Sequence, residues 1–131
     1  MRLTVGAPHV LPEAAVTALG LPDSYYVSLR QSYQARRDLL FGKVKEAGFV
    51  AWEPKGAYYI LTDVAHFMER HGCRDDHEFA MFLIKNIGVA TVPGSSFYAH
   101  GELGRTKIRF CFPKTDDLLI EAGSRLQKLA R

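Results

Sequence analysis

The sequence predicts an α/β domain of two layers, in which a small mixed or antiparallel sheet carries its helices on one face. Two observations predict this fold class. Helix-periodic and strand-like segments follow one another in the order α-α-β-β-α-β-β-α, and the helical segments are apolar along one side only. A helix with one apolar side needs one partner surface, and a small sheet provides it. With 131 residues, the chain has the usual size of a single domain and can bury one hydrophobic core.

Two helices are expected in the first third of the chain. The first covers residues 12–19 and ends at Gly20, because glycine often follows the last turn of a helix. The second runs over residues 24–47 and ends at Gly48. Its apolar stripe has the spacing of an α-helix and consists of Tyr25, Leu29, Tyr33, Leu40, Val44 and Ala47.

A pair of strands follows these helices. Residues 49–52 and 57–62 are β-prone, and residues 53–56 between them read Glu-Pro-Lys-Gly. The proline fixes its own φ and the glycine accepts a positive φ, so the four residues are typical of a turn. We therefore expect an antiparallel pair.

Two further helices are predicted from the capping and charged residues at their ends. The third begins after Asp75, with Glu78 three residues later as in a capping box, and its inward side holds Phe79, Phe82, Leu83 and Ile87. The last begins at Thr115, with acidic residues in its first turn and Lys128 near its end, which matches the helix dipole. Its side toward the sheet consists of Leu119, Ala122, Leu126 and Leu129.

Two strands around a polar loop are expected in residues 88–112. Residues 89–92 form a β-prone run that Pro93-Gly94 stops, and residues 107–112 form a second run. Side chains alternate along a strand, so Ile108, Phe110 and Phe112 share one face and Arg109 lies on the other.

Arg109 is therefore a guanidinium within an aromatic strand, expected on the sheet face that the helices leave open. A partly desolvated guanidinium calls for an anion, and a carboxylate accepts its fork through two parallel hydrogen bonds. The pattern alone fits a structural ion pair or a solvated side chain more often than a binding site. Arg109 is thus a candidate for carboxylate recognition, with these alternatives open.

Composition argues against several classes of protein. The chain is 47% hydrophobic and 24% charged, and no stretch approaches the roughly 18 apolar residues of a membrane span. Residues 1–10 lack the apolar core of a signal peptide. Two cysteines make no disulfide framework and fit a reducing cytoplasm. We expect a cytoplasmic protein that does not bind membranes.

Nucleic-acid binding and metal binding are not expected either. The net charge of +3 is spread along the chain, and the basic residues of the second helix, with no groove-reading motif, are explained by an ordinary helix surface. Residues 71–77 gather metal-capable side chains, but their spacing fits neither a zinc knuckle nor a calcium loop. His9, His66 and His100 have no nucleophile at a motif spacing, so no catalytic residue is predicted.

Six segments in a fixed order carry a resemblance to a known family. They are TVGAPHVLPEAAVTAL, LPDSYYVSLRQSYQARRDLL, AGFVAWEPKGAYYILTDV, PGSSF, TKIRFCF and RLQKL. Their order resembles the C-terminal small domain of the class I and II pyridoxal-phosphate aminotransferases. The resemblance runs along nearly the whole chain.

The resemblance implies a domain organisation and a set of site residues. Residues 1–23 would connect two domains and residues 24–131 would form the small domain, without the large domain that binds pyridoxal phosphate. Arg109 would bind the α-carboxylate of the substrate, and Ser95 and Phe97 would line the active site. The family's Schiff-base lysine and most cofactor-binding groups belong to the large domain, so no catalytic or cofactor-binding residue is expected in this chain.

The resemblance also implies a function. The parent enzyme would transfer an amino group between an amino acid and a 2-oxo acid with pyridoxal phosphate, as a homodimer. This chain would need the missing large domain as a partner, would be inactive alone and would hold no cofactor by itself. A stand-alone, non-catalytic α/β binding or interaction domain is the alternative. The choice of amino acid stays open, because the family sets it largely through residues outside this chain.

Overall fold

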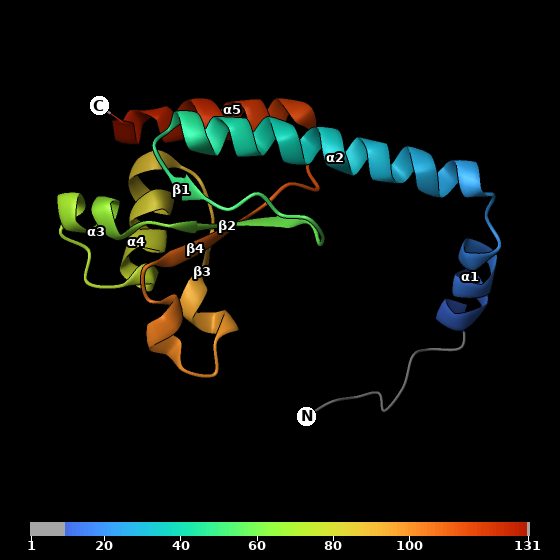
Figure 1. Ribbon diagram of the computed structural model, residues 1–131, viewed down its shortest axis with the longest axis horizontal. Coiled ribbons are helices and arrows are strands. Elements are labelled where there is room, and N and C mark those ends of the chain that lie inside the picture. Colours follow the sequence, from blue (N-terminus) through green and yellow to red (C-terminus); the bar gives the residue numbers. More distant parts are fainter. Residues whose placement is uncertain (1–9, 131) are drawn as a thin grey trace. The chain divides into compact units, whose positions relative to one another are not determined.

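The structure is a computed structural model that describes residues 10–130, so the predictions for residues 1–9, His9 among them, lie outside the described part. The chain divides into two compact units, Met1–Ser32 and Tyr33–Arg131. The helices and strands, labelled in Figure 1, are α1 (Val10–Leu19), α2 (Asp23–Glu46), β1 (Val50–Ala51), β2 (Tyr59–Asp63), α3 (Ala65–His71), α4 (Asp76–Phe82), β3 (Val92–Pro93), β4 (Lys107–Cys111) and α5 (Asp116–Leu126).

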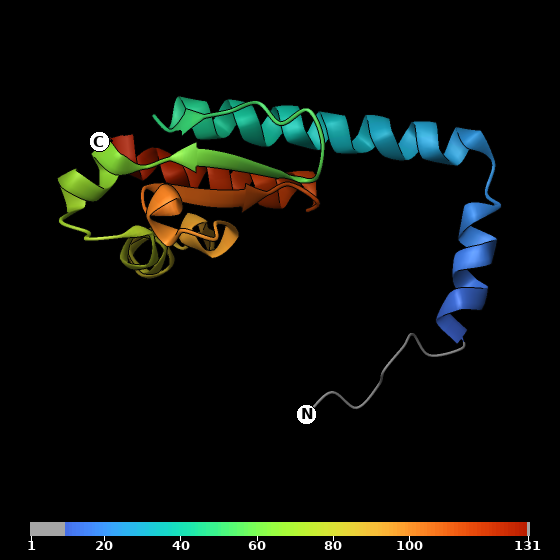
Figure 2. The same cartoon turned by 60° about the horizontal axis from the view of Figure 1, so that its bottom comes forward.

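The four strands form one sheet in the order β1-β2-β4-β3, and every neighbouring pair is antiparallel. The predicted pairing of the first two strands is confirmed. Figure 1 shows α5 and the second half of α2 along the same side of this sheet, and Figure 2 shows β2 and β4 in front of α5 and running along it. The predicted fold class, a small sheet with helices in a second layer, is confirmed.

The sheet buries one face under these helices. Along β2 and β4 buried and partly exposed residues alternate, and the buried ones are Ile60, Thr62, Ile108 and Phe110. The helices pack Leu40 and Val44 of α2 and Leu119 and Leu126 of α5 into the same hydrophobic core. The residues between them on the strands, Tyr59, Leu61, Lys107 and Arg109 among them, remain half-buried on the opposite face. The predicted alternation along β4 is confirmed.

The two covering helices meet closely at Gly123 of α5. A Cβ atom built on Gly123 would lie 2.7 Å from both Cβ and Cγ of Lys43 on α2. These atoms are near the backbone of α2 and cannot swing away, so Gly123 sets the distance between the helices. Gly42, one residue earlier than Lys43, has open space where its Cβ would lie.

Alanine at these two glycines is expected to have opposite effects. Gly123→Ala should lower the free energy of unfolding by about 1 to 3 kcal/mol, because the added methyl overpacks the helix contact. Gly42→Ala should raise it by about 0.5 to 1 kcal/mol, since alanine is the better helix former and clashes with nothing. Urea unfolding of both variants measures the difference. A stabilised Gly123→Ala protein would contradict the close approach of α2 and α5.

One helix was not predicted. α3 follows β2 directly, so the observed order contains a pair of helices, α3 and α4, where the sequence predicted one. Its first residue, Ala65, donates its N–H to the Asp63 carboxylate at 2.9 Å, and Gly72 ends it with a left-handed φ of 67°. α3 carries Phe67 and Met68 into the core.

The capping of α4 differs in part from the prediction. Asp75 is the N-cap and its side chain accepts the Glu78 N–H at 2.9 Å, as predicted. The reciprocal bond of a capping box is not formed, because the Glu78 carboxylate accepts the Arg74 N–H at 2.8 Å and pairs with the Arg74 guanidinium. Of the predicted inward residues Phe79, Leu83 and Ile87 are buried, whereas Phe82 is only half-buried.

The strand after α4 is shorter and later than predicted. The helix ends in a π turn, Leu83–Ile87, and the Val89 N–H bonds the Leu83 carbonyl at 3.2 Å. This bond belongs to the helix end, so residues 89–91 are not in the sheet. β3 therefore consists of Val92 and Pro93, opposite Arg109 and Ile108 of β4.

The predicted apolar stripe of the second helix is buried only in its later part. Leu40 and Val44, and Ala47 just after the helix, are buried, whereas Tyr25 and Leu29 are 48% and 42% exposed. The other exposed large apolar residues of the first unit are Leu11, Val16, Leu19, Leu21, Tyr26 and Val27. None of the helices within residues 10–130 combines the length and hydropathy that crossing a membrane requires.

Candidate functional site

Arg109 lies in the middle of β4 on the sheet face away from α2 and α5. Its neighbours in register are Leu61 on β2 and Val92 on β3, which are both aliphatic. The side chain is half-buried. Neither strand neighbour offers a charge or a hydrogen-bond acceptor on its side chain, so the surroundings of the guanidinium are set by other residues.

Two aromatic rings enclose the Arg109 guanidinium. Its central carbon lies 4.8 Å from the ring centre of Tyr59 and 4.3 Å from that of Phe97, both within the range of a cation–π contact. Its Nε atom is buried without a hydrogen-bond partner. Over residues 10–130 no ion pair and no side-chain hydrogen bond involves Arg109. The guanidinium thus keeps its two Nη groups unpaired on a half-covered surface.

Phe97 and Ser95 belong to one 3₁₀ turn, Gly94–Phe97, that follows β3. Phe97 is 47% exposed and covers one side of the Arg109 guanidinium. Ser95 makes a different contact: its backbone N–H donates to the Asp76 carboxylate at 2.7 Å. The structure therefore brings Arg109 and Phe97 together, while the Ser95 amide is occupied by a helix residue.

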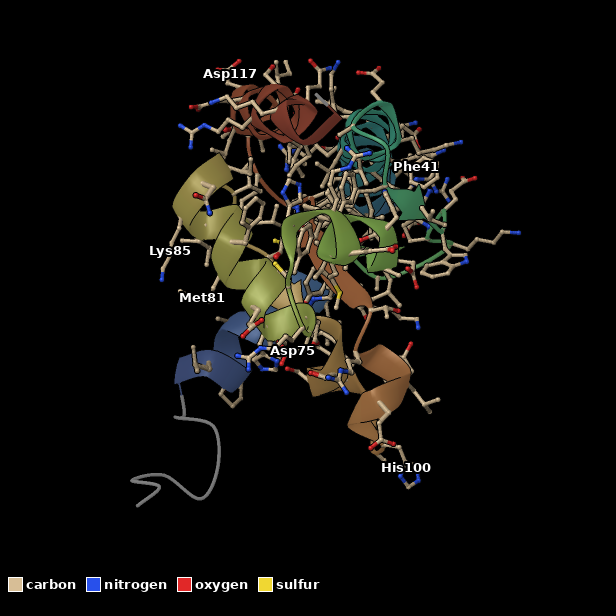
Figure 3. The ribbon with its side chains drawn as sticks, turned by 90° about the vertical axis from the view of Figure 1, so that its left-hand side faces the viewer. Phe41, Asp75, Met81, Lys85, His100 and Asp117 are labelled. Atoms are coloured by element: carbon tan, nitrogen blue, oxygen red, sulfur yellow. The ribbon has the colours of Figure 1, made fainter. Side chains whose placement is uncertain are left out.

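The turn that carries Phe97 packs against a second one, Gly101–Gly104. A Cβ atom on Gly104 would lie 2.5 Å from the carbonyl oxygen of Gly94 and from the Ser95 nitrogen, and one on Gly94 would lie 2.8 Å from the Gly104 oxygen. The two backbones touch with no room for a side chain between them. In Figure 3, His100 marks the tip of this double turn, at the end of the unit opposite Asp117 of α5.

Asp76 is the charged residue that holds this loop. It is the first residue of α4, it is only 2% exposed, and its other carboxylate oxygen lies 3.4 Å from Nδ1 of His77. Burial acts on the pKa of Asp76 most strongly and raises it, but the hydrogen bonds from Ser95 and His77 outweigh burial and leave that pKa below its ordinary value of 3.8. The fold therefore favours the ionised carboxylate.

Asp76→Asn is expected to lose part of the acid sensitivity of the fold. A carboxyl whose folded pKa is lowered stabilises the fold above its unfolded pKa, and this stability disappears as the pH falls through the folded value. The wild-type protein should therefore lose stability below about pH 4. Asp76→Asn should cost about 1 kcal/mol at neutral pH and show a smaller loss in acid, because a neutral acceptor is weaker.

The measurement is urea unfolding between neutral and acidic pH in about 1 M salt, where the Debye length is about 3 Å. The high salt matters because the exposed Arg74 guanidinium, through its hydrogen bond, lowers the pKa of Glu78 to about 2 and adds its own acid sensitivity. Salt screens that surface pair far more than the buried Asp76. An identical pH dependence in wild type and Asp76→Asn would contradict the role of Asp76.

The group Asp75, Asp76 and His77 contains possible metal ligands that lie within 4.8 Å of one another. Two of the three already have partners in the protein. Asp75 accepts the Glu78 N–H and Asp76 accepts the Ser95 N–H. Helix capping and loop attachment account for the clustering, and Figure 3 shows Asp75 at the start of α4.

Sequence reasoning missed Tyr59 and Asp76 as parts of this site. The sequence pattern marks Tyr59 only as a strand residue and Asp76 only as one of several polar residues before a helix. The pairing of β2 with β4 brings Tyr59 diagonally across from Arg109, two positions along β2 from its partner Leu61. That pairing joins segments about 50 residues apart, so no local pattern carries the signal.

The lysines of the described chain do not form a site for pyridoxal phosphate. A lysine that binds a carbonyl cofactor must be desolvated and placed beside it. Within residues 10–130 no lysine is buried; Lys43 pairs with Glu46, and Lys107 donates to the Leu103 carbonyl at 2.8 Å. The cofactor therefore does not fit among these residues alone.

The described part of the chain is thus an α/β domain whose open sheet face presents an arginine between two aromatic rings. Residues 1–125 match the model of the family described as aminotransferase class I and II. The chain belongs to this family, whose members depend on pyridoxal phosphate and act on amino acids and 2-oxo acids.

Individual relatives agree with this assignment. The kynurenine–oxoglutarate transaminase 1 of Rattus norvegicus is 31% identical over 118 residues, which cover 83% of this chain and 28% of that protein. The solved structure of N-succinyldiaminopimelate aminotransferase from Mycobacterium tuberculosis superposes with a TM-score of 0.76 at 35% identity, over 89% of this chain and 29% of that one. An aromatic aminotransferase from Pyrococcus horikoshii gives a TM-score of 0.73 at 28% identity, over 88% and 29%.

The chain spans less than a third of the length of these relatives. Their names indicate different amino-acid substrates, namely kynurenine, N-succinyldiaminopimelate and aromatic amino acids.

Proposed function

We propose that this chain is the carboxylate-binding part of a pyridoxal-phosphate-dependent aminotransferase and that Arg109 binds the α-carboxylate of the amino-acid substrate. The observation that carries the proposal is the Arg109 guanidinium, half-buried on the open sheet face and held by two rings instead of by an acidic side chain. Such a cation attracts a carboxylate strongly, because the two Nη atoms and the carboxylate oxygens form parallel bonds.

In this proposal the chain contributes orientation. Pyridoxal phosphate supplies the electron sink for amino-group transfer when it is bound by the rest of the enzyme. Arg109 fixes the carboxylate end of the substrate, which directs its amino group toward the cofactor. Phe97 and Ser95 belong to the loop that forms the wall beside Arg109, with Phe97 against the guanidinium and Ser95 tied to α4.

We further propose that residues 1–23 connect this domain to a large domain, that residues 24–131 form the small domain, and that the complete enzyme is a cytoplasmic homodimer. The exposed apolar side chains of the first unit, such as Val16 at 68% and Leu19 at 81%, support a partner surface, because they are concentrated within residues 11–29 and do not occur singly. Cys73 and Cys111 are both unpaired, which supports a reducing compartment.

The test supplies the part of the enzyme that this chain does not span. The matching segment of the Mycobacterium tuberculosis aminotransferase is replaced by this chain. The two parts are either fused or expressed separately and combined, and either product is the assembled enzyme. With pyridoxal phosphate, a 2-oxo acid and a panel of amino acids, the assembled enzyme is expected to transfer amino groups. Each part alone serves as the control and is expected to be inactive.

Two outcomes would reject the proposal. A folded assembled enzyme that binds pyridoxal phosphate yet transfers no amino group from any amino acid would argue against the enzymatic role. Tight binding of an unrelated ligand by this chain, with every pairing inactive, would favour a stand-alone binding or interaction domain instead.

A further inference from the structure

The contacts between Arg109 and its two rings hold the cation in place without using its N–H donors. An arginine on a half-open surface has many rotamers, and holding it still normally takes an acidic side chain or a carbonyl group. Either of these partners would use the same N–H donors that a substrate carboxylate needs. A ring attracts the cation through its negative face and consumes no donor.

The two rings come from independent elements. Tyr59 is on β2, a strand paired with β4 along five residue positions, so its place relative to Arg109 is fixed by the sheet. Phe97 is on the turn after β3, and this turn is fixed by the Ser95 bond to Asp76 and by the contact between Gly94 and Gly104. The guanidinium is thus held from two directions by parts that do not depend on each other.

The unpaired donor of Arg109 agrees with this arrangement. Its Nε atom is enclosed and has no acceptor, whereas its two Nη atoms are not enclosed in that way within the described chain. An enclosed donor without an acceptor is costly, and rings that stack on the cation offset part of that cost. The free side of the guanidinium is left for a ligand with two oxygen atoms.

We propose that Tyr59 and Phe97 form an aromatic clamp whose purpose is to position Arg109 for a carboxylate while leaving its donors unoccupied. This inference rests on the proposed function of Arg109 and adds two positioning residues to it. Neither ring reacts with the substrate. The clamp restricts the rotamers of Arg109 before a ligand arrives, so the side chain loses less conformational entropy when a carboxylate binds. Removing one ring therefore weakens carboxylate binding.

The test uses the 131-residue chain itself and follows the Nε–Hε NMR signal of Arg109, which Arg109→Lys identifies. Sodium acetate is the carboxylate probe, and sodium chloride at the same ionic strength is the control for nonspecific anions. The variants are Tyr59→Leu, Phe97→Leu and Tyr59→Phe, which keeps the ring. Tyr98→Leu is the matched control, because the Tyr98 ring lies 5.9 Å from the Lys107 ammonium and contacts that cation instead.

In the wild-type chain acetate is expected to move the Arg109 signal in a saturable way, and chloride is not. Tyr59→Leu and Phe97→Leu should weaken acetate binding about 2- to 30-fold, the range that one cation–π contact corresponds to. They should also shift the signal toward that of a free arginine and speed its exchange with water. Tyr59→Phe and Tyr98→Leu should leave all three properties unchanged.

The two levels of the proposal fail in different ways. If acetate binds the two leucine variants as well as the wild type, the clamp is wrong and the role of Arg109 stands. If acetate moves the wild-type signal no more than chloride does, the proposed function is wrong and the clamp inference falls with it.

Discussion

Arg109→Ala is expected to lower kcat/KM of the assembled enzyme about 30- to 1000-fold, because a desolvated bidentate carboxylate bond contributes roughly 2 to 4 kcal/mol. The loss should appear for every amino acid in the panel, since all share the α-carboxylate. Steady-state kinetics with pyridoxal phosphate in excess measures it. Arg109→Lys should recover only a small part of the activity, because an ammonium cannot form the two parallel bonds.

Arg105→Ala is the matched control for this substitution. Arg105 is exposed, lies four residues earlier, and its guanidinium donates to the Arg74 carbonyl at 3.3 Å. Its loss should leave kcat/KM within about twofold, as expected for a surface change worth less than about 0.5 kcal/mol. Equal effects of the two substitutions, or an unchanged kcat/KM in Arg109→Ala, would remove Arg109 from the binding site.

Phe67→Ala is expected to have the largest effect on stability, a loss of about 3 to 5 kcal/mol. Phe67 is 2% exposed, and its ring centre lies 4.7 Å from that of Phe49 and 6.1 Å from that of Phe79. Removing the ring leaves a cavity among side chains from α3, α4 and the segment before β1. A domain with a total stability of about 5 to 15 kcal/mol would become marginal.

Phe97→Ala gives the comparison, because it removes the same ring from a position that is 47% exposed. Its cost should stay near 1 kcal/mol, mostly from the lost contact with the Arg109 guanidinium. Urea unfolding at neutral pH measures both variants. A Phe67→Ala protein as stable as Phe97→Ala would mean that α3 is not part of the core.

The contrast between β4 and α3 shows what local sequence patterns reveal about this fold. The alternation of Ile108, Arg109 and Phe110 is repeated every second residue, so the face of each side chain followed from the sequence alone. α3 has seven residues, its N-cap residue Val64 makes no side-chain capping bond, and the helix buries Phe67 and Met68 in the core. A segment that short shows no helical period, because it contains only about two turns.

The residues of the candidate site also differ in whether local sequence or tertiary contacts determine their roles. Arg109 was predicted because its strand context is local. Tyr59 and Asp76 were not, because their roles depend on which strand pairs with β4 and on which loop reaches the start of α4. Ser95 was expected to line the active site, and no local pattern indicated that its amide bonds a buried carboxylate of the protein itself. Tertiary packing determines these hydrogen-bond partners, and a local sequence pattern does not reveal them.

The contact between Gly94 and Gly104 limits how this enzyme family member can be redesigned. Any side chain at either position would drive the two backbones apart, since the gap between them is smaller than a methyl group. A library that varies this loop should therefore keep both glycines and randomise the exposed stretch around His100. Mutations there change the rim of the loop while its base, and with it the ring against Arg109, stays where it is.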